Sequence, residues 1–453
     1  MIMHGLSYLI LGLGKTGHSI ARYLTRQNKP FLVFDTRSSP SGLKEFTDEF
    51  PNAQVFLAEF PAELYSQIIE IISSPGVALD HPVVQHAASM GIPIIGDIEC
   101  LVREVQAPMV AITGTNGKST VTTLVGDMAV AAGLSVAVAG NIGAPVLDLL
   151  DENKHYDLWV LELSSFQLDL THSIAPVAAT ILNVSPDHLD RHHSLAAYVQ
   201  AKQRVYHQAK FLLYNREDSL TIPADKAVHA HISSFGLNAP TQVQNESFEW
   251  GIMTENNINY LAYGQKKLMS VNELKIKGQH NWANALAACA LAHAAGIDFP
   301  HMIEVLQRFS GLPHRSQWVR TLDGIDWIND SKGTNIGATL SAISGIGASL
   351  EGKIVLIAGG QGKGADFTEL RASMSNFVRS VVLIGEDADL MEQALVNAVH
   401  TLRARSLDEA IQLAKLEALS GDVVLLSPAC ASLDMFRDFN HRGEVFTAVV
   451  NAL

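Results

Sequence analysis

One stretch decides the fold: Ile112-Thr113-Gly114-Thr115-Asn116-Gly117-Lys118-Ser119-Thr120. It follows an apolar run that starts at Pro108 and precedes a helical pattern over 121–132, which predicts a glycine turn between a strand and a helix. Backbone N–H groups at the two glycines, aligned with the positive end of the helix, would bind phosphate oxygens. Lys118 would add a charge at the terminal phosphates, and the hydroxyl of Ser119 or Thr120 suits Mg²⁺. The stretch therefore predicts a nucleoside triphosphate site.

This loop is shorter than the usual P-loop. The spacing G-x-x-x-x-G-K-[ST] would place a glycine at position 112, where this chain has isoleucine. An ordinary strand-to-helix turn is the alternative, because glycine, serine and threonine are common in such turns. Two glycines followed by Lys118, Ser119 and Thr120 favour the phosphate site.

Length and composition limit the remaining possibilities. A chain of 453 residues is too long for one hydrophobic core, and three domains are expected. Apolar residues make up 47% of the sequence, enough to fill three cores. The net charge of -14, without a cluster of basic residues, argues against wrapping nucleic acid or an anionic membrane. We expect a monomer that acts on small molecules.

The cysteines and the N-terminus predict a cytoplasmic protein. Cys100, Cys289 and Cys430 are far apart and lack C-x-x-C spacing, so neither a disulfide framework nor a zinc site is indicated. The first residues lack a basic segment ahead of an apolar core, and no run of about 18 apolar residues occurs. We therefore expect no membrane insertion.

The first segment has the pattern of a dinucleotide-binding unit. An apolar run over 8–11 leads into Gly12-Leu13-Gly14-Lys15-Thr16-Gly17, a helical pattern over 19–26 and a strand over 31–34 that ends at Asp35. Alone, this pattern would suggest NAD and a dehydrogenase. The same turn serves any diphosphate, however, and Asp35-Thr36-Arg37 offers one acceptor and two donors to a base and ribose.

The segment after the phosphate loop predicts a buried parallel sheet. Apolar runs over 135–139, 158–161 and 179–182 alternate with helical patterns. Polar residues follow these strands, where ligands gather in such sheets: Asn141, Glu162 to Gln167, and Asn183 to Arg191. Glu162 is either a solvated strand end or a Mg²⁺ ligand, and the neighbouring triphosphate loop favours the metal. The polar stretch over 238–267 predicts hairpins or loops.

The last third predicts another α/β unit, with strands over 326–328, 354–357, 381–384 and 423–426. The loops 329–335, 359–366 and 427–434 follow three of these strands. Before this unit, Asn281 and Asn284 share one face near the start of a helix, where they would either cap it or contact adenine. Lys363, in the second loop, is either a solvated cation or a receptor for a carboxylate.

The sequence thus predicts an α/β protein of three domains. They are a Rossmann-like N-terminal domain over 1–96, a central P-loop ATPase-like domain with a parallel sheet over 97–312, and a C-terminal Rossmann-like domain over 313–453.

The motifs resemble those of the Mur ligases, ATP-dependent enzymes that form amide bonds. Thr-Gly-Thr-Asn-Gly-Lys-Ser-Thr, Glu-Leu-Ser-Ser-Phe-Gln and Asn-Val-Ser-Pro-Asp-His-Leu-Asp-Arg carry the resemblance, in the order of the family. It implies that the first domain binds the UDP of a UDP-sugar rather than NAD. A dehydrogenase is the next candidate, but it would leave the Lys118 loop unexplained. Asp35-Thr36-Arg37 and Ser74-Pro75-Gly76 are similar to the branch that adds D-glutamate to UDP-N-acetylmuramoyl-L-alanine, a cytosolic step of peptidoglycan synthesis.

The resemblance also implies roles for individual residues. Lys118, His188 and Lys202 would be catalytic. Two Mg²⁺ ions would be held by Ser119, Glu162, His188 and a carbamylated Lys202. ATP would be bound by Gly114, Thr115, Asn116, Gly117, Lys118, Ser119, Thr120, Asn281, Asn284, Arg315, Asp330 and Lys332. The UDP-sugar would be bound by Gly14, Lys15, Thr16, Asp35, Thr36, Arg37, Ser74, Gly76, Asn141, Gln167 and His188. D-glutamate would be bound by Thr334, Lys363, Ser432, Leu433 and Phe439.

Three alternatives remain beside the D-glutamate-adding ligase. The first is another Mur ligase. The second is a folylpolyglutamate synthase, which shares the ATP loop but would lack the first domain, and the third is a regulatory P-loop ATPase, which would hydrolyse ATP without an amino acid. His192 and His193 are expected at the surface, and no residue is assigned as general base for the amine.

Overall fold

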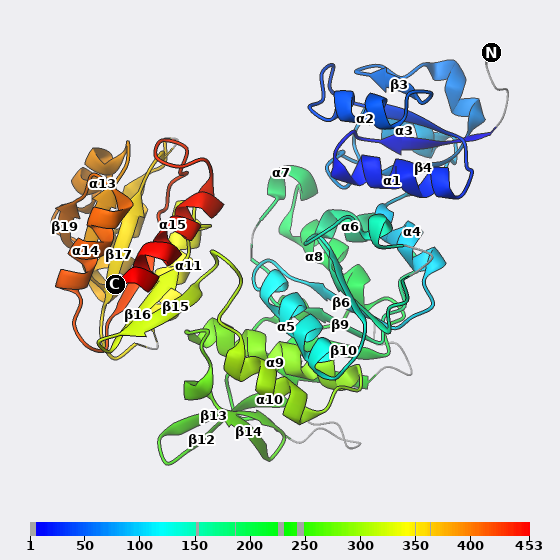
Figure 1. Ribbon diagram of the computed structural model, residues 1–453. Coiled ribbons are helices and arrows are strands. Elements are labelled where there is room, and N and C mark those ends of the chain that lie inside the picture. The colour runs from blue at the N-terminus through cyan, green and yellow to red at the C-terminus, as the bar shows by residue number, and fades with distance from the viewer. Residues whose placement is uncertain are drawn as a thin grey trace. The chain divides into compact units, whose positions relative to one another are not determined.

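The computed structural model describes residues 6–150, 154–185, 187–224, 231–241, 249–348, 350–362 and 364–453, with the side chains of Leu189 and Asp190 excepted. It contains three sheets, of five, nine and six strands, and confirms the predicted α/β class with parallel sheets in three domains (Figure 1). The chain divides into two compact units. One comprises Met1–Gly251, Ala262–Lys266 and Leu286–Met302, and the other comprises Ile252–Leu261, Lys267–Ala285 and Ile303–Leu453.

The N-terminal sheet is parallel throughout. Its strand order is β3 (Gln54–Leu57), β2 (Phe31–Asp35), β1 (Ser7–Leu11), β4 (Ile68–Ser73) and β5 (Ile94–Ile95). Its helices are α1 (Lys15–Arg26), α2 (Leu43–Glu49) and α3 (Pro82–Ser89). Helix α1 begins before the predicted residue 19 because the glycine turn is tight: a Cβ on Gly17 would lie 1.9 Å from the carbonyl oxygen of Gly12. The turn therefore ends directly in the helix.

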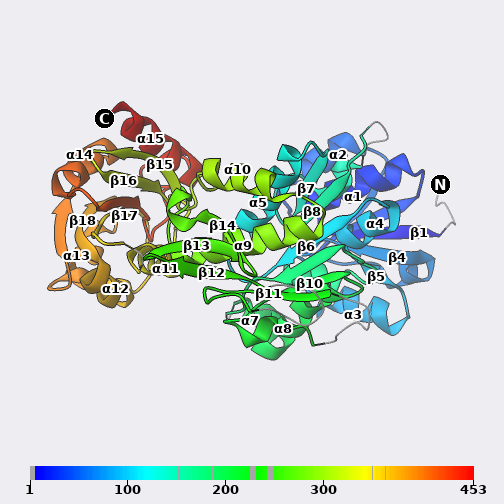
Figure 2. The same ribbon diagram turned by 90° about the horizontal axis from the view of Figure 1, so that it is seen from below.

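The central sheet places three strand ends side by side. Strands β9 (Ala178–Ile181), β6 (Met109–Thr113), β8 (Leu158–Glu162) and β7 (Val136–Gly140) are adjacent and parallel. Figure 2 shows β6, β8 and β7 next to one another. Strands β6 and β8 are fully buried, as their unbroken apolar runs predict. Glu162 pairs in register with Ile112 on one side and Gly140 on the other. The loops after β6, β7 and β8 therefore start at one edge of the sheet.

The helices of this unit follow from these strands. Helix α5 (Lys118–Ala131) leaves β6, and α6 (Ser165–Asp169) leaves β8. Helices α4 (Asp97–Glu104), α7 (Leu189–His192) and α8 (Leu195–Gln203) complete the surroundings of the loops. The sheet continues through β10 (Phe211–Asn215) and β11 (His231–Phe235) to β12 (Trp250–Glu255), β13 (Ile258–Tyr263) and β14 (Lys266–Ser270). The hairpins expected over 238–267 are confirmed for the described part of that stretch, which excludes 242–248.

The C-terminal sheet has the order β15 (Gln317–Leu322), β16 (Ile325–Asn329), β20 (Val423–Leu426), β17 (Ile354–Gly359), β18 (Val378–Ile384) and β19 (His400–Arg403). The sequence analysis missed β15, which pairs antiparallel with β16, and the edge strand β19. Leu426 pairs with Asn329 and with Ile357, so the loops after β16, β20 and β17 lie at one edge. The helices of this domain are α11 (Ile336–Gly347), α12 (Arg371–Phe377), α13 (Ala388–Leu395), α14 (Leu407–Glu417) and α15 (Phe439–Ala452), and α9 (Gln279–Ala294) and α10 (Phe299–Arg308) precede it in the chain.

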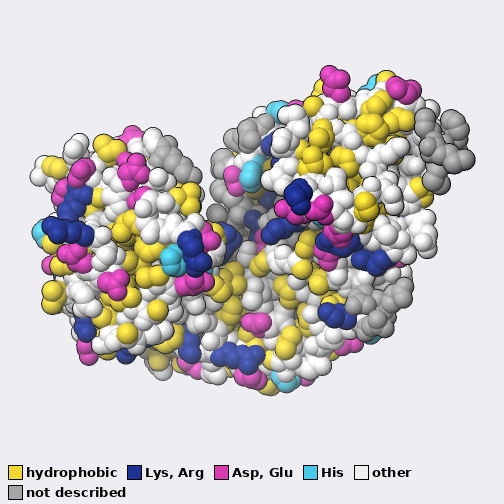
Figure 3. All heavy atoms as spheres, turned by 45° about the horizontal axis from the view of Figure 1, so that its top comes forward, with side chains coloured by type: hydrophobic (Ala, Val, Ile, Leu, Met, Phe, Trp, Pro, Cys, Tyr) yellow, Lys and Arg dark blue, Asp and Glu magenta, His cyan; other side chains and the backbone are white. Residues whose placement is uncertain are grey.

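The surface mixes charges of both signs. On the face in Figure 3, basic and acidic side chains are interspersed with apolar ones over the described residues. Within the part of the chain that the structure describes, no helix has the length and apolar character needed to cross a membrane.

Candidate active site

The phosphate loop has a backbone that glycine allows. Gly117 has a φ of +82° and Gly114 a φ of +150°, where a Cβ would lie 3.0 Å from the Cβ of Leu182. Asn183 holds the loop from the end of β9: its Oδ1 accepts from the Asn116 N–H at 2.8 Å, and its Nδ2 donates to the Asn116 carbonyl at 3.0 Å. This holding role of Asn183 was missed, although the sequence analysis placed the residue at a strand end.

Lys118 is the first residue of α5. Its Nζ donates to the carbonyl oxygens of Gly114 at 3.0 Å and Thr115 at 2.9 Å, which are part of its own loop. Ser119 and Thr120, in the first turn of the helix, are partly buried. The cation and the N–H groups of the helix therefore gather where a phosphate would bind.

A cavity of about 300 Å³ opens beside this loop. Among the predicted site residues, Gly76, Lys118, Asn141, His188 and Lys202 line it. The cavity thus brings together a loop of the N-terminal domain, the phosphate loop and three elements of the central domain.

Glu162 is a buried carboxylate that contacts Asn141, one of the residues that line the cavity. Its side chain is 2% exposed, and its Oε1 accepts from the Asn141 Nδ2 at 3.0 Å. Its Oε2 is buried and has no hydrogen-bond partner. A buried carboxylate oxygen without a partner is costly, and Mg²⁺ would satisfy it. Ser119 lies in the first turn of α5, which leaves the neighbouring strand β6. A carboxylate and a hydroxyl are oxygen ligands that suit Mg²⁺, so these residue types fit the predicted metal.

Lys202 is buried at the same place, with 1% of its surface exposed. Its Nζ donates to the Gly114 carbonyl at 3.0 Å and to the Thr113 Oγ1 at 3.4 Å, and it lies 4.4 Å from the centre of the Tyr198 ring. Burial, and then the charge of Lys118, lower the pKa of Lys202 to about 7. A large fraction of this side chain is therefore a neutral amine near pH 7.

Tyr198 was missed by the sequence analysis. It is 2% exposed, its hydroxyl lies 3.3 Å from the Thr115 Oγ1, and its ring lies under the Lys202 ammonium. The signal was present in the sequence, because Tyr198 precedes Lys202 by four residues on a helix and so shares its face.

The two neighbouring histidines differ. His193 has a side chain 73% exposed, as predicted. The surface placement of His192 was wrong: it is 9% exposed, its Nε2 lies 2.8 Å from the Ser165 Oγ, and its ring stacks on Phe166 with centres 5.2 Å apart. The reason is the short helix α7, which ends at His192 and turns that ring inward. Burial lowers the pKa of His192.

His188 is half-exposed and lines the cavity, with a φ of +52°. Its ring meets the edge of Phe166 at 5.0 Å between centres. Gln167, in contrast, is buried, and its Oε1 accepts from the Ser164 N–H at 3.1 Å within a capping box of α6. The Gln167 oxygen is thus engaged in helix capping.

In the N-terminal domain, Asp35 shapes the glycine turn. It is 2% exposed, its Oδ2 accepts from the Leu13 N–H at 2.7 Å, and Arg37 binds both of its oxygens at 2.7 and 2.8 Å. Burial would raise the pKa of Asp35, but the hydrogen bonds from Arg37 and Leu13 outweigh it and lower the pKa to about 2. The predicted acceptor for a base or ribose is therefore already bonded within the protein.

The other residues predicted for the UDP-sugar in this domain differ in exposure. A Cβ on Gly14 would meet nothing within 4 Å, Lys15 is exposed, and Thr16 is partly exposed. The Oγ of Ser74 is buried without a hydrogen-bond partner and lies where it would contact a Cβ on Gly12 at 3.1 Å. Thr36 is exposed beside Asp35.

In the second unit, Asp330 lies at the strand-end edge. It accepts from the Ser427 Oγ at 2.7 Å and the Ser316 N–H at 3.0 Å, and burial raises its pKa to about 6. The Lys332 Nζ lies 4.7 Å from the centre of the Phe439 ring. Arg315 is exposed.

The residues predicted for the amino acid are at the same edge. Ser432 is buried, Thr334 partly buried, and Leu433 is 62% exposed. Lys363 lies outside the described residues. Arg442, which the sequence analysis missed, is 1% exposed and joins two of these loops through hydrogen bonds to the carbonyls of Ser331 at 2.9 Å and Cys430 at 3.2 Å.

Asn281 and Asn284 contact each other near the start of α9. The Asn284 Nδ2 donates to the Asn281 Oδ1 at 3.1 Å, and the Asn281 Nδ2 donates to the Lys277 carbonyl at 2.8 Å. The amide of Asn281 is therefore used within its own segment. Neither hydrogen bond is an N-cap, in which a side-chain oxygen accepts from a backbone N–H of the helix, so the choice between capping and adenine stays a prediction.

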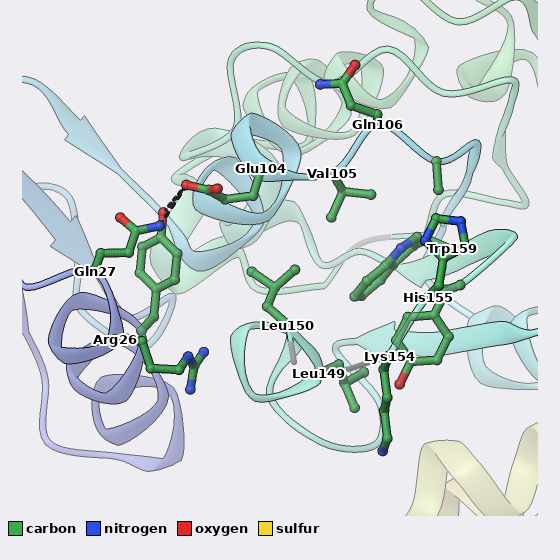
Figure 4. A pocket seen from close by; sticks show the side chains of 13 residues that line it. Arg26, Gln27, Glu104, Val105, Gln106, Leu149, Leu150, Lys154, His155 and Trp159 are labelled. Carbon is green, nitrogen blue, oxygen red and sulfur yellow. Dashed lines mark hydrogen bonds between the residues drawn. The ribbon is translucent and has the colours of Figure 1, made fainter. Parts of the chain in front are cut away.

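A larger cavity, of about 480 Å³, lies elsewhere in the first unit (Figure 4). Leu149, Leu150 and Trp159 form apolar parts of its wall, and Arg26 and Glu104 lie across from them. The Glu104 carboxylate accepts from Tyr23 and Gln27, each at 2.8 Å. None of the predicted site residues is among its described lining residues, so the smaller cavity is the candidate site.

The comparisons agree with this placement of motifs. Family models match three segments: "Mur ligase MurD-like, N-terminal domain" at residues 7–96, "Mur ligase middle domain" at 112–292, and "Mur ligase, glutamate ligase domain" at 314–430. A curated protein of Legionella pneumophila (strain Philadelphia 1), named UDP-N-acetylmuramoylalanine--D-glutamate ligase, is 63% identical over 98% of this chain and 99% of its own. One of the same name from Pseudomonas aeruginosa is 49% identical over 98% of both chains.

Solved structures show the same fold at low identity. The structure of a UDP-N-acetylmuramoyl-L-alanyl-D-glutamate--2,6-diaminopimelate ligase has a TM-score of 0.59 at 17% identity, and the match covers 93% of this chain and 92% of that chain. This match shows the shared fold, and the family models together with the full-length relatives establish that the chain belongs to the Mur ligase family.

Proposed function

We propose that this protein is an ATP-dependent ligase that adds D-glutamate to UDP-N-acetylmuramoyl-L-alanine and releases ADP and phosphate, in the cytoplasmic stage of peptidoglycan synthesis. The observation that carries the proposal is the cavity lined by both Gly76 of the N-terminal domain and Lys118 of the phosphate loop. A sugar nucleotide and a triphosphate bound at these loops would meet in it. The names of the full-length relatives support the choice of amino acid.

The geometry of the phosphate loop supports the acyl-phosphate chemistry that the family resemblance implies. The substrate carboxylate would attack the γ-phosphate of ATP, ADP would leave, and the amine of D-glutamate would then displace phosphate from the acyl phosphate. Lys118 and the N–H groups at the start of α5 would stabilise charge that builds on the phosphoryl oxygens. Bound Mg²⁺ would neutralise phosphate charge and align the reacting oxygens. Ser119 and Glu162 would hold one ion, and His188 with Lys202 the other.

The second ion requires a change in Lys202. As an ammonium this side chain would repel Mg²⁺, but as a neutral amine it can react with CO2 and lose a proton, which gives a carbamate anion. The lowered pKa of Lys202 and its burial beside Lys118 support this modification. The carbamate would supply oxygen ligands at a place where the unmodified chain has a cation.

We also propose a ligand for each domain. Domains over 1–96, 97–312 and 313–453 would bind the UDP-sugar, ATP and the amino acid with part of the nucleotide. Thr334 and Ser432 would bind D-glutamate with Lys363, and their hydroxyls would be left unpaired by the wrong amino acid.

The test is phosphate release from ATP and UDP-N-acetylmuramoyl-L-alanine, measured with D-glutamate, with D-glutamine and without an amino acid. We expect turnover with D-glutamate and a strong loss, of about 10⁴-fold, with D-glutamine, because the distal carboxylate would lose its partners. Release without any amino acid would instead indicate a regulatory ATPase. Release that requires a folate in place of the UDP-sugar would indicate a folylpolyglutamate synthase, and NAD binding at micromolar concentration would revive the dehydrogenase.

A further inference from the structure

Arg191 joins two domains of the first unit. It lies in α7 of the central domain, and its Nη1 and Nη2 donate to the carbonyl oxygens of Gly76 at 3.2 Å and Val77 at 3.1 Å. Both carbonyls belong to the N-terminal loop after β4 that contains Ser74. A guanidinium that binds two adjacent carbonyls fixes direction as well as distance, because its donors form a rigid fork.

The same guanidinium packs on Phe166. The Arg191 Cζ lies 4.6 Å from the centre of the Phe166 ring, within the range of a cation–π contact. Phe166 is in α6, directly after the loop that starts at Glu162, and it also lines the cavity. His188 and His192 contact the ring as well, with centres 5.0 and 5.2 Å away.

These contacts connect the two sides of the cavity. On one side is the Gly76 loop, and on the other are Phe166 and His188, which follow strands β8 and β9 as the phosphate loop follows β6. Arg191 contacts both sides, since it bonds to the Gly76 carbonyl and packs on Phe166, and these two residues line the cavity. Arg191 thus contacts two backbone carbonyls of the N-terminal domain and an aromatic ring of the central domain at the same time.

We propose that Arg191, held by Phe166, is a positioning residue that fixes the Gly76–Val77 loop relative to the phosphate loop. This proposal rests on the proposed function, since the loop would place the carboxylate of the sugar nucleotide against ATP. A small misplacement of reacting groups lowers the rate far more than it lowers the affinity for either substrate. Arg191 would thus control alignment without contacting the reacting atoms.

The test compares Arg191→Ala and Arg191→Lys with Arg204→Ala as a matched control. Arg204 pairs with Asp169 at 3.7 Å within the central domain, so its loss leaves the domain link intact. For Arg191→Ala we expect a kcat about 10- to 100-fold lower, a raised KM for the UDP-sugar and an unchanged dissociation constant for ATP alone. Lysine keeps the charge but not the fork, and we expect it to restore only a small part of kcat.

Hydrogen–deuterium exchange supplies a readout that does not depend on turnover. Amides over 74–79 should exchange several-fold faster in Arg191→Ala than in the wild type, while Arg204→Ala should match the wild type. Phe166→Leu should resemble Arg191→Ala, and the double variant should be little worse than either single one, since the two act as a unit.

Three results would overturn the proposal: unchanged exchange over 74–79, a kcat for Arg191→Ala within twofold of the wild type, or an equal loss of ATP binding, which would indicate general damage to the fold. If the wild type fails to release phosphate in response to D-glutamate, the proposed function fails, and the exchange data alone decide whether Arg191 fixes the loop.

Discussion

Lys118 and Lys202, from two different helices, both donate to the carbonyl oxygen of Gly114, each at 3.0 Å. Two ammonium groups on one carbonyl repel each other, and Lys202 is the more deeply buried of the two. Burial, and then the charge of Lys118, lower the pKa of Lys202 to about 7. Under the proposed function, this pair would allow a triphosphate site to contain a lysine that can react with CO2.

The first prediction concerns this modification. Lys202→Ala should lose activity at least about 100-fold, because it removes the oxygen ligands that the carbamate would supply. Added acetate or formate should restore part of the activity by entering the vacated space as a carboxylate. Lys202→Arg, which cannot form the carbamate, should stay inactive with or without the acid.

A ¹³C NMR measurement distinguishes carbamylation of Lys202 from a purely structural role of this side chain. With [¹³C]bicarbonate, a carbamate signal should appear in the wild type and be absent in Lys202→Arg. The signal should grow as pH rises through about 7 and then level off, because the amine must lose its proton before it reacts with CO2. Full activity in Lys202→Ala, or a wild-type spectrum without the signal, would contradict the carbamate.

The second prediction concerns Lys118. Lys118→Ala should lower kcat by about 10²-fold or more, since it removes a charge aligned with the transferred phosphoryl group. The fold should persist, because the side chain lines a cavity and its Nζ donates to carbonyls of its own loop. Steady-state kinetics and the thermal unfolding midpoint Tm check both parts. A variant that retains more than about a tenth of the wild-type kcat would remove the basis for this site.

The positions of the motifs that follow strands could be predicted from the sequence, because the carboxyl ends of parallel strands lie at one edge of a sheet. Glu162 lies in register with Ile112 and Gly140 because three apolar runs pair as parallel strands, of which β6 and β8 are fully buried and β7 alternates between buried and half-buried residues. The sequence also located Lys202 on a helix, but its burial depends on Tyr198 and on the loop of Thr113 and Gly114, which belong to a distant strand.

Other features depend on tertiary contacts that no local pattern carries. Histidine is compatible with either environment, so the burial of His192 could not be separated from the exposure of His193 by residue type. Asp35 looked like a free acceptor because the N–H that it binds, that of Leu13, is brought to it only when β1 and β2 pair. Arg442 joins loops that are more than a hundred residues apart in the chain.

The third prediction concerns Asp35. Asp35→Ala should raise the KM for the UDP-sugar and leave the KM for ATP nearly unchanged, because the lost carboxylate holds the glycine turn through the Leu13 N–H. Asp35→Asn keeps an acceptor for that N–H and should have a smaller effect. If both variants raise the KM for ATP equally, the turn influences the whole unit and the assignment of the first domain to the UDP-sugar loses support.

The last prediction concerns stability and pH at Asp97. This residue begins α4, is 4% exposed, and accepts from the Ile98 N–H at 3.0 Å. Burial raises its pKa from 3.8 to about 6, against weaker lowering by the hydrogen bonds of Ile98 and Gln167. The native state therefore binds more protons at this group than the unfolded state does, and the free energy of unfolding falls as pH rises from about 4 to about 6. Above that range the full cost of a buried charge, roughly 2 to 3 kcal/mol, is present.

Asp97→Asn removes this cost while it keeps an acceptor for the Ile98 N–H. We expect the variant to raise the Tm of the first unfolding transition at pH 8 and to raise it less at pH 5, where the native carboxyl is mostly protonated and the wild type carries less of the penalty. Asp48→Asn is the control, because Asp48 is 66% exposed and pairs with Lys44 at the surface. Thermal unfolding of the three proteins at both pH values measures the difference. An equal gain at pH 5 and pH 8 would mean that the amide improves packing and that the charge of Asp97 does not limit stability.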